Sequence, residues 1–191
     1  MFKKFVMNKI AVLLAEGFEE IEAISIIDVL RRADFEVTTV SITGKPEVSG
    51  SHAVTILADQ VFEETNYSDF DMIVLPGGIP GAINLKNHRG LQNQILDFHK
   101  KGKLLGAICA APLVFGNLGI LKNETVTCYP GFEDQLKGAK VTGNKVEQSG
   151  KIVTGKGAGV AIDFALKIVE ILKGKELSDE LGKKMIATGL S

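Results

Sequence analysis

The sequence predicts an α/β fold in which a doubly wound, mostly parallel sheet is sandwiched between helices. Two observations support this prediction. Short, continuously apolar runs recur along the chain, and segments with helical periodicity separate many of them. Apolar strands that alternate with helices are typical of a parallel sheet covered on both faces. The 191 residues, of which 45% are apolar, fit a single domain with a substantial core.

Six apolar, β-rich runs are predicted as strands. They are residues 9–15 (KIAVLLA), 36–42 (EVTTVSI), 71–76 (DMIVLP), 103–108 (KLLGAI), 124–129 (ETVTCY) and 151–155 (KIVTG). Helical periodicity predicts helices over residues 19–33, 90–101, 110–118 and 160–173. Two further segments are expected to decorate the core sheet. Residues 48–56 predict a short two-stranded excursion, and residues 145–155 predict a hairpin that turns at Ser149-Gly150.

The rest of the chain limits domain organisation and location. Residues 1–8 are expected to form a short extension, and residues 9–191 one domain, because no linker or repeat divides them. No window of about 18 uninterrupted apolar residues exists, so a membrane-spanning helix is not expected. The net charge of −1 is dispersed, which disfavours nucleic acid and membrane surfaces as partners. Two cysteines are too few for a disulfide framework and indicate a reducing, cytoplasmic setting.

Cys109 lies where the predicted strand 103–108 passes directly into a predicted helix. Reactive groups are often held at such a place, as in a nucleophile elbow, although GAICAA differs from the G-x-S-x-G pattern. Ala110 leaves room for a ligand to approach. Pro112 fits the first helical turn, whose amino terminus is expected to favour the thiolate. The alternative is a small buried hydrophobe, which Cys128 fits better.

Glu22 is the candidate acid. A helix that begins near Glu19 places Glu22 on one stripe with Ile26, Val29 and Ala33. A carboxyl on this apolar stripe would be partly desolvated, which would raise its pKa and allow it to donate a proton. The alternative, in which Glu22 reaches solvent at the start of the helix, is equally compatible with the stripe.

Pro76-Gly77-Gly78 ends a predicted strand with residues that impose little bulk. This lets backbone N–H groups point into the crevice, where they would suit an oxyanion. An ordinary glycine turn is the alternative, and the tripeptide alone favours it.

No metal or cofactor is predicted. The three histidines are scattered, and no H-x-x-H or C-x-x-C pair offers metal-ligand spacing. The stretch GKGAG, residues 155–159, could hold an anion at the start of a helix. It is not a P-loop, because neither Ser nor Thr follows its Gly-Lys pair.

In this order, AEGFEEIEAISIIDVLRRA, VLPGG and AICAAP resemble the ThiJ/PfpI family, in the branch of the Parkinson-disease protein deglycase. The resemblance extends from about Lys9 to GAGVAIDFALKIVEIL and so covers nearly the whole chain. It implies a flavodoxin-like, class I glutamine amidotransferase-like fold and a homodimer. It also implies that Cys109 is a strained nucleophile, that Glu22 hydrogen-bonds its sulfur, and that Gly78 and Ala110 are the backbone donors.

The chain departs from the family pattern at three positions. His52 stands where related proteins often carry an arginine that lines the site near the subunit interface. Tyr129 stands where many relatives with glyoxalase activity carry a histidine, the obvious general base. Ala110 replaces the histidine of the protease-like branch. No histidine matches the Cys-His-Glu triad of the more distant class I glutamine amidotransferases, so peptide and amide hydrolysis are both disfavoured. The remaining pocket residues are expected to be Gly77 and Pro130.

These features predict a cysteine-dependent protective protein that acts on small reactive dicarbonyls or their early glycation adducts, with Cys109 as nucleophile and Glu22 as its assistant. Its partner would be a small aldehyde or a glycated adduct. The alternative is an oxidative-stress sensor or chaperone-like protein, switched when Cys109 is oxidised to a sulfinate. A third interpretation is a catalytically silent α/β domain that retains an old crevice.

Overall fold

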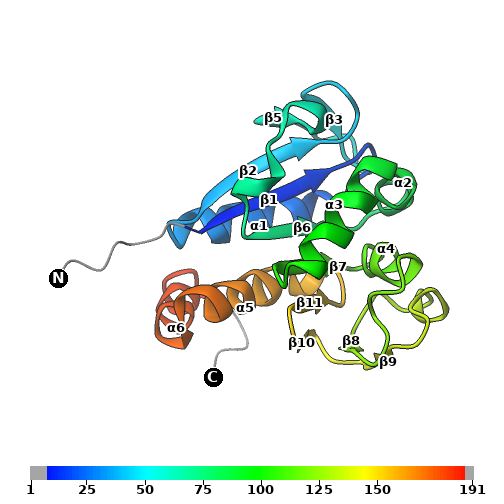
Figure 1. Cartoon of the computed structure of the whole chain (residues 1–191). Coiled ribbons are helices and arrows are strands. Elements are labelled where there is room, and N and C mark those ends of the chain that lie inside the picture. The colour runs from blue at the N-terminus through cyan, green and yellow to red at the C-terminus, as the bar shows by residue number, and fades with distance from the viewer. Residues whose placement is uncertain (1–7, 188–191) are drawn as a thin grey trace.

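The computed structural model describes residues 8–187, and a seven-stranded sheet forms its centre (Figure 1). The strand order is β10-β11-β7-β6-β1-β2-β5, and every neighbouring pair is parallel except β10 and β11. The predicted doubly wound sheet is therefore confirmed. The strands are β1 (Lys9–Leu14), β2 (Glu36–Ser41), β5 (Gln60–Val61), β6 (Met72–Leu75), β7 (Leu104–Ile108), β10 (Val146–Ser149) and β11 (Ile152–Gly155).

Strand β1 shows why the sheet is buried on both faces. Its side chains alternate between two hydrophobic clusters, with Ile10, Val12 and Leu14 in one and Ala11 and Leu13 in the other. All five side chains are fully buried. The continuous apolar run of the sequence therefore supplies one strand that contributes to both halves of the core.

Helices cover both faces of the sheet. The first cluster includes buried residues of α1 (Glu20–Arg32), α5 (Ala161–Lys173) and α6 (Lys175–Lys184). The second includes buried residues of α2 (Gly81–Asn87), α3 (Arg89–Lys100) and α4 (Pro112–Asn117). The sequence patterns predicted α1, α3 and α5 closely, but α4 begins two residues later than expected, and neither α2 nor α6 was predicted. Within residues 8–187, four 3₁₀ turns complete the helical segments: η1 (Phe62–Glu64), η2 (Tyr67–Asp69), η3 (Glu133–Gln135) and η4 (Ala158–Val160).

Both predicted excursions are present, but the hairpin turns at Gly150-Lys151, one residue later than expected. Strands β3 (Glu47–Ser49) and β4 (Thr55–Leu57) form an antiparallel pair outside the central sheet. Strands β10 and β11 form the antiparallel hairpin at one edge of that sheet. The turn between β3 and β4 matters for the site, because it lies against the start of α1 through the hydrogen bond from the Ser51 N–H to the Phe18 carbonyl.

The prediction of a strand over residues 124–129 was wrong in extent. Only β8 (Thr125–Val126) is extended, and it pairs with β9 (Lys140–Val141) in a separate two-stranded sheet. Beyond β8, the backbone bonds to a side chain of β11 and to loop groups and does not pair with the backbone of a neighbouring strand. The N–H of Thr127 donates to the Thr154 hydroxyl at 2.9 Å. The strand propensity of ETVTCY is thus overridden by side-chain and loop partners.

The predicted extension, residues 1–8, lies outside the described residues except for Asn8, and the limits 9–191 of the domain stay a prediction. Within residues 8–187, no helix is both long enough and apolar enough to cross a lipid bilayer.

Candidate active site

Cys109 follows β7 directly, in an unusual backbone conformation. Its φ is +62°, in the left-handed region that residues other than glycine rarely adopt. Two hydrogen bonds hold it there: its N–H donates to the Gly155 carbonyl at 2.9 Å, and its carbonyl accepts from the Tyr129 N–H at 2.9 Å. The sequence therefore forms a strained turn at the carboxyl end of the strand, as the elbow pattern predicts.

Glu22 lies in the first turn of α1 and is fully buried. The side chain of Glu19 caps this helix by accepting from the Glu22 N–H at 2.7 Å. The Gly77 N–H donates to Glu22 Oε2 at 2.7 Å. Burial of the stripe that includes Ile26 and Val29 bears out the apolar-face interpretation. The solvent-facing alternative is wrong.

The Glu22 carboxyl and the Cys109 thiol interact directly, and each shifts the pKa of the other. Burial raises the pKa of Glu22 to about 7, against the lowering effect of hydrogen bonds from the Gly77 N–H and the thiol. Among the described residues, Oε1 of Glu22 has no hydrogen-bond partner of ordinary geometry. One oxygen of the carboxyl is thus available to exchange a proton next to the thiol.

Backbone N–H groups also surround the sulfur. Those of Ala110 and Gly78 both hydrogen-bond to the Cys109 thiol, which favours its thiolate form. Gly78 has φ +91°, and a Cβ there would collide with the backbone of Phe18 and Glu19. The tight packing of the glycine turn against the start of α1 therefore requires glycine.

The expectation of an acidic thiol is not borne out. Burial raises the pKa of Cys109 to about 12, and the negative charge of Glu22 and its hydrogen bond act in the same direction. The hydrogen bonds from Ala110 and Gly78 oppose this without overcoming it. α4 begins at Pro112, so the proline occupies the first helical turn as predicted.

The other predicted pocket residues divide into two groups. Gly77 lies between the thiol and the carboxyl, since a Cβ on it would come within 2.7 Å of Cys109 Cβ and 2.9 Å of Glu22 Oε2. Tyr129 and Pro130 line a cavity of about 340 Å³. His52 belongs to neither place.

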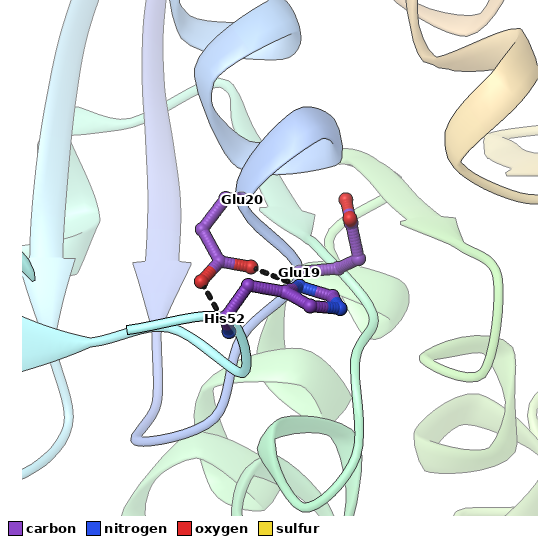
Figure 2. A group of neighbouring side chains, drawn as sticks. All are labelled: Glu19, Glu20 and His52. Carbon is purple, nitrogen blue, oxygen red and sulfur yellow. Dashed lines mark hydrogen bonds and ion pairs between the residues drawn. The ribbon is translucent and has the colours of Figure 1, made fainter. Parts of the chain in front are cut away.

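His52 lies instead with Glu19 and Glu20 (Figure 2). Each of the three residues offers one ligand atom, and these atoms all lie within 4.8 Å of one another, so the group has a composition that could hold a metal ion. This group was not predicted from the sequence, because local metal-ligand motifs have short spacings and His52 lies 32 positions from Glu20 in the chain.

The contacts of Glu20 show that this group has a structural role, and we call it the Glu20 clamp. Its carboxylate accepts from the His52 N–H at 2.5 Å and from the Ser51 hydroxyl at 3.3 Å, and it lies 2.8 Å from His52 Nδ1. Burial alone would raise the pKa of Glu20, but the hydrogen bonds from His52 outweigh it and lower the pKa to about 2. Glu20 therefore fastens the β3–β4 turn to the start of α1, the turn of helix that carries Glu22.

Comparisons with known proteins agree with this architecture. Residues 8–171 match the DJ-1/PfpI family. Protein DJ-1 homolog B of Arabidopsis thaliana is 38% identical over 94% of this chain and 41% of its own length. The glutathione-independent glyoxalase DJR-1.2 of Caenorhabditis elegans is 36% identical over 89% of this chain and 91% of its own. The chain therefore spans less than half of the plant relative and nearly all of the nematode one.

Among solved structures, oxidized DJ-1 of Toxoplasma gondii is 37% identical to this chain and superposes with a TM-score of 0.91. The match covers 95% of this chain and all of that one. Sequence and fold thus agree over most of the described residues, and the chain belongs to the DJ-1/PfpI family.

Proposed function

We propose that this protein is a cofactor-free, cysteine-dependent enzyme that converts small α-oxoaldehydes to hydroxy acids. The observation that carries the proposal is the pairing of the Cys109 thiol with the buried Glu22 carboxyl, beside the N–H groups of Gly78 and Ala110. The nematode glyoxalase to which the chain is similar supports the same chemistry. Removal of early glycation adducts from proteins or nucleotides would use the same residues.

The first step is addition of sulfur to the aldehyde. Because the resting thiol keeps its proton, ionised Glu22 takes that proton as the S–C bond forms. The carbonyl oxygen gains the negative charge, and the N–H groups of Gly78 and Ala110 stabilise it. Glu22 then returns the proton to this oxygen, which gives a neutral hemithioacetal and restores the carboxylate.

The second step moves electrons within the substrate. Glu22 removes the hydrogen of the former aldehyde carbon as a proton, and the electron pair reduces the neighbouring carbonyl through an enediol. Protonation of that neighbouring carbon gives the thioester of a hydroxy acid. Water then cleaves the thioester, releasing the acid and the Cys109 thiol. One carbon is oxidised and the other reduced, so no external oxidant is needed. A carboxyl with a pKa of about 7 suits these transfers at neutral pH and replaces the imidazole that Tyr129 does not supply.

The test is product formation by the purified protein. With methylglyoxal as substrate, lactate should appear, whereas Cys109→Ala should yield no lactate above the uncatalysed background. Glu22→Gln should lower kcat/KM about 100-fold or more, as expected for loss of general acid–base catalysis. Equal lactate from the native protein and Cys109→Ala would overturn the proposal.

The proposed assembly is a homodimer, as the resemblance to the family implies. Ile21 and Ile24 are 59% and 48% exposed on α1, and Val54 is 50% exposed on the neighbouring β3–β4 turn. The Val54 N–H lies 3.5 Å from the Glu20 carboxylate, so the turn that carries Val54 lies beside the first turn of α1. Exposed apolar patches of this kind mark interaction sites, and a second copy of the chain is the occupant we propose.

A second candidate function is oxidation sensing at Cys109. The buried, unpartnered Oε1 of Glu22 supports it, because a protonated carboxyl there would donate to an oxygen added to the sulfur. The similar Toxoplasma structure is of an oxidized form. On peroxide titration, intact-protein mass should show a gain of two oxygens at Cys109 before any at Cys128 or the methionines. Earlier oxidation elsewhere would contradict the sensor.

A further inference from the structure

A cavity of about 340 Å³, open to solvent, is lined by Tyr129 and by the segment that follows Gly155, and its lining is almost entirely apolar. Tyr129 and Pro130 form one wall, and Lys156 with residues 157–160 forms the other. For scale, an apolar cavity of about 150 Å³ is large enough to bind benzene. The cavity therefore has room for much more than the methyl group of the smallest α-oxoaldehydes.

Both walls are attached to the backbone of Cys109. The Tyr129 N–H donates to the Cys109 carbonyl, and the Cys109 N–H donates to the carbonyl of Gly155, one residue before Lys156. Each of these hydrogen bonds is 2.9 Å long. Both walls are therefore hydrogen-bonded, directly or through the preceding residue, to the backbone of the residue whose sulfur would hold the substrate.

Two side chains make the cavity apolar. The Tyr129 ring is half exposed and covers Gly157, where an added Cβ would lie 3.3 Å from the ring atom Cδ2. Lys156 directs its ammonium to the Gly143 carbonyl at 3.0 Å, so its aliphatic stem faces the cavity while its charge is engaged elsewhere.

We propose that this cavity is a specificity subsite for an aromatic substituent carried by the α-oxoaldehyde that binds Cys109, and that Tyr129 is its specificity-determining residue. This inference rests on the proposed function, since it assigns the substrate class of the same site. In this proposal Tyr129 does not act as a base. It contributes an aromatic surface that recognises the side group of the substrate.

The test compares two α-bromoketones that alkylate thiols in the same way, phenacyl bromide and bromoacetone. Sulfur forms a bond to carbon, bromide leaves, and the thiol proton passes to buffer. The rate of labelling at Cys109 is followed by mass spectrometry of its peptide and divided by the rate with glutathione. The normalised preference for the phenacyl reagent should be about tenfold or more, the size of effect that one well-fitted apolar group provides.

Tyr129→Ala should abolish this preference, whereas Tyr129→Phe should keep it because the ring remains. Ala158→Asp is a second variant that leaves the ring in position and puts a carboxylate in the cavity, and it should also abolish the preference. A ratio equal to that of glutathione, a ratio unchanged in Tyr129→Ala and Ala158→Asp, or no labelling of Cys109 by either reagent would each overturn the subsite.

Turnover separates this inference from the proposed function. Comparison of kcat/KM for phenylglyoxal and methylglyoxal should show the same preference of about tenfold. If both substrates are turned over without a preference and the labelling ratio equals that of glutathione, the subsite is contradicted and the proposed enzymatic function is not. If Cys109 prefers the phenacyl reagent but neither substrate is turned over, the proposed enzymatic function is contradicted and the subsite is not.

Discussion

The backbone N–H of Gly77 donates to Glu22 Oε2 at 2.7 Å, across 55 positions of the chain. This bond joins the turn after β6 to the first turn of α1, and it holds the carboxyl next to the thiol of Cys109. The glycine can make it because its Cα approaches both side chains more closely than a residue with a Cβ could. The raised pKa of Glu22 and the close packing at Gly77 can therefore both be tested by substitution.

The buried carboxyl should make stability fall as pH rises. The pKa of Glu22 is about 7 in the folded protein and 4.5 as a free side chain, so the folded state binds its proton more tightly. The contribution to stability is therefore full below pH 4.5 and is lost by about pH 7. Glu22→Gln should raise the free energy of unfolding by up to about 3 kcal/mol at pH 8.5, with little effect at pH 4. Urea unfolding at both pH values measures this difference, and an equal effect at both would contradict the raised pKa.

Alkylation of Cys109 by iodoacetamide should report the coupling of the two groups. In the native protein the rate should rise with pH up to about 7 and then level off, because loss of the first proton from the pair creates the carboxylate that accepts the thiol proton. In Glu22→Gln this inflection should disappear. Peptide mass spectrometry distinguishes Cys109 from Cys128, and a variant profile that keeps the inflection near pH 7 would assign it to another group.

Gly77→Ala should damage the site and the fold together. The added methyl group would lie 2.7 Å from Cys109 Cβ and 2.9 Å from the Ile108 carbonyl oxygen, both inside contact distance. Overpacking of this kind costs about 1–3 kcal/mol, and the displaced sulfur should lose reactivity. Gly143→Ala is the matched control, because nothing lies within 4 Å of its added Cβ. Thermal unfolding and alkylation should change only in the first variant.

The proposed homodimer should depend on the exposed isoleucines of α1. Ile21→Glu combined with Ile24→Glu should convert the dimer to a monomer, since burial of two carboxylates in an apolar interface is strongly unfavourable. Leu96→Glu is the control, because Leu96 is 41% exposed on α3, which covers the opposite face of the sheet. Light scattering during size-exclusion chromatography gives the mass. A monomeric native protein would contradict the proposal.

The sequence patterns predicted the architecture well where hydrophobic periodicity alone determines the element. Continuous apolar runs identified β1, β2, β6, β7 and β11 but not the two-residue edge strand β5, and helical periodicity identified α1, α3 and α5. The strand expected over residues 124–129 failed because Thr127 takes its partners from β11 and a loop, which propensity does not detect. Helix α2 was missed because Gly, Pro and Asn in and around it obscure its periodicity.

Local patterns also account for what was predicted of the site and what was missed. Strand ends and the apolar stripe of α1 predicted the positions of Cys109 and Glu22, because both depend on local geometry. The Glu20 clamp was missed, because the partners of Glu20 come from a turn more than thirty positions away. The pKa of Cys109 was expected to fall but is raised, because burial depends on how distant segments pack around the sulfur.

The backbone partners of Cys109 have a consequence for biosynthesis. The groups that fix its strained conformation belong to Tyr129 and Gly155, and both residues are translated after it. A nascent chain that ends before residue 155 therefore contains the cysteine without the acceptor for its N–H. The thiol acquires its functional geometry only after residue 155 has left the ribosome and β11 has joined the sheet.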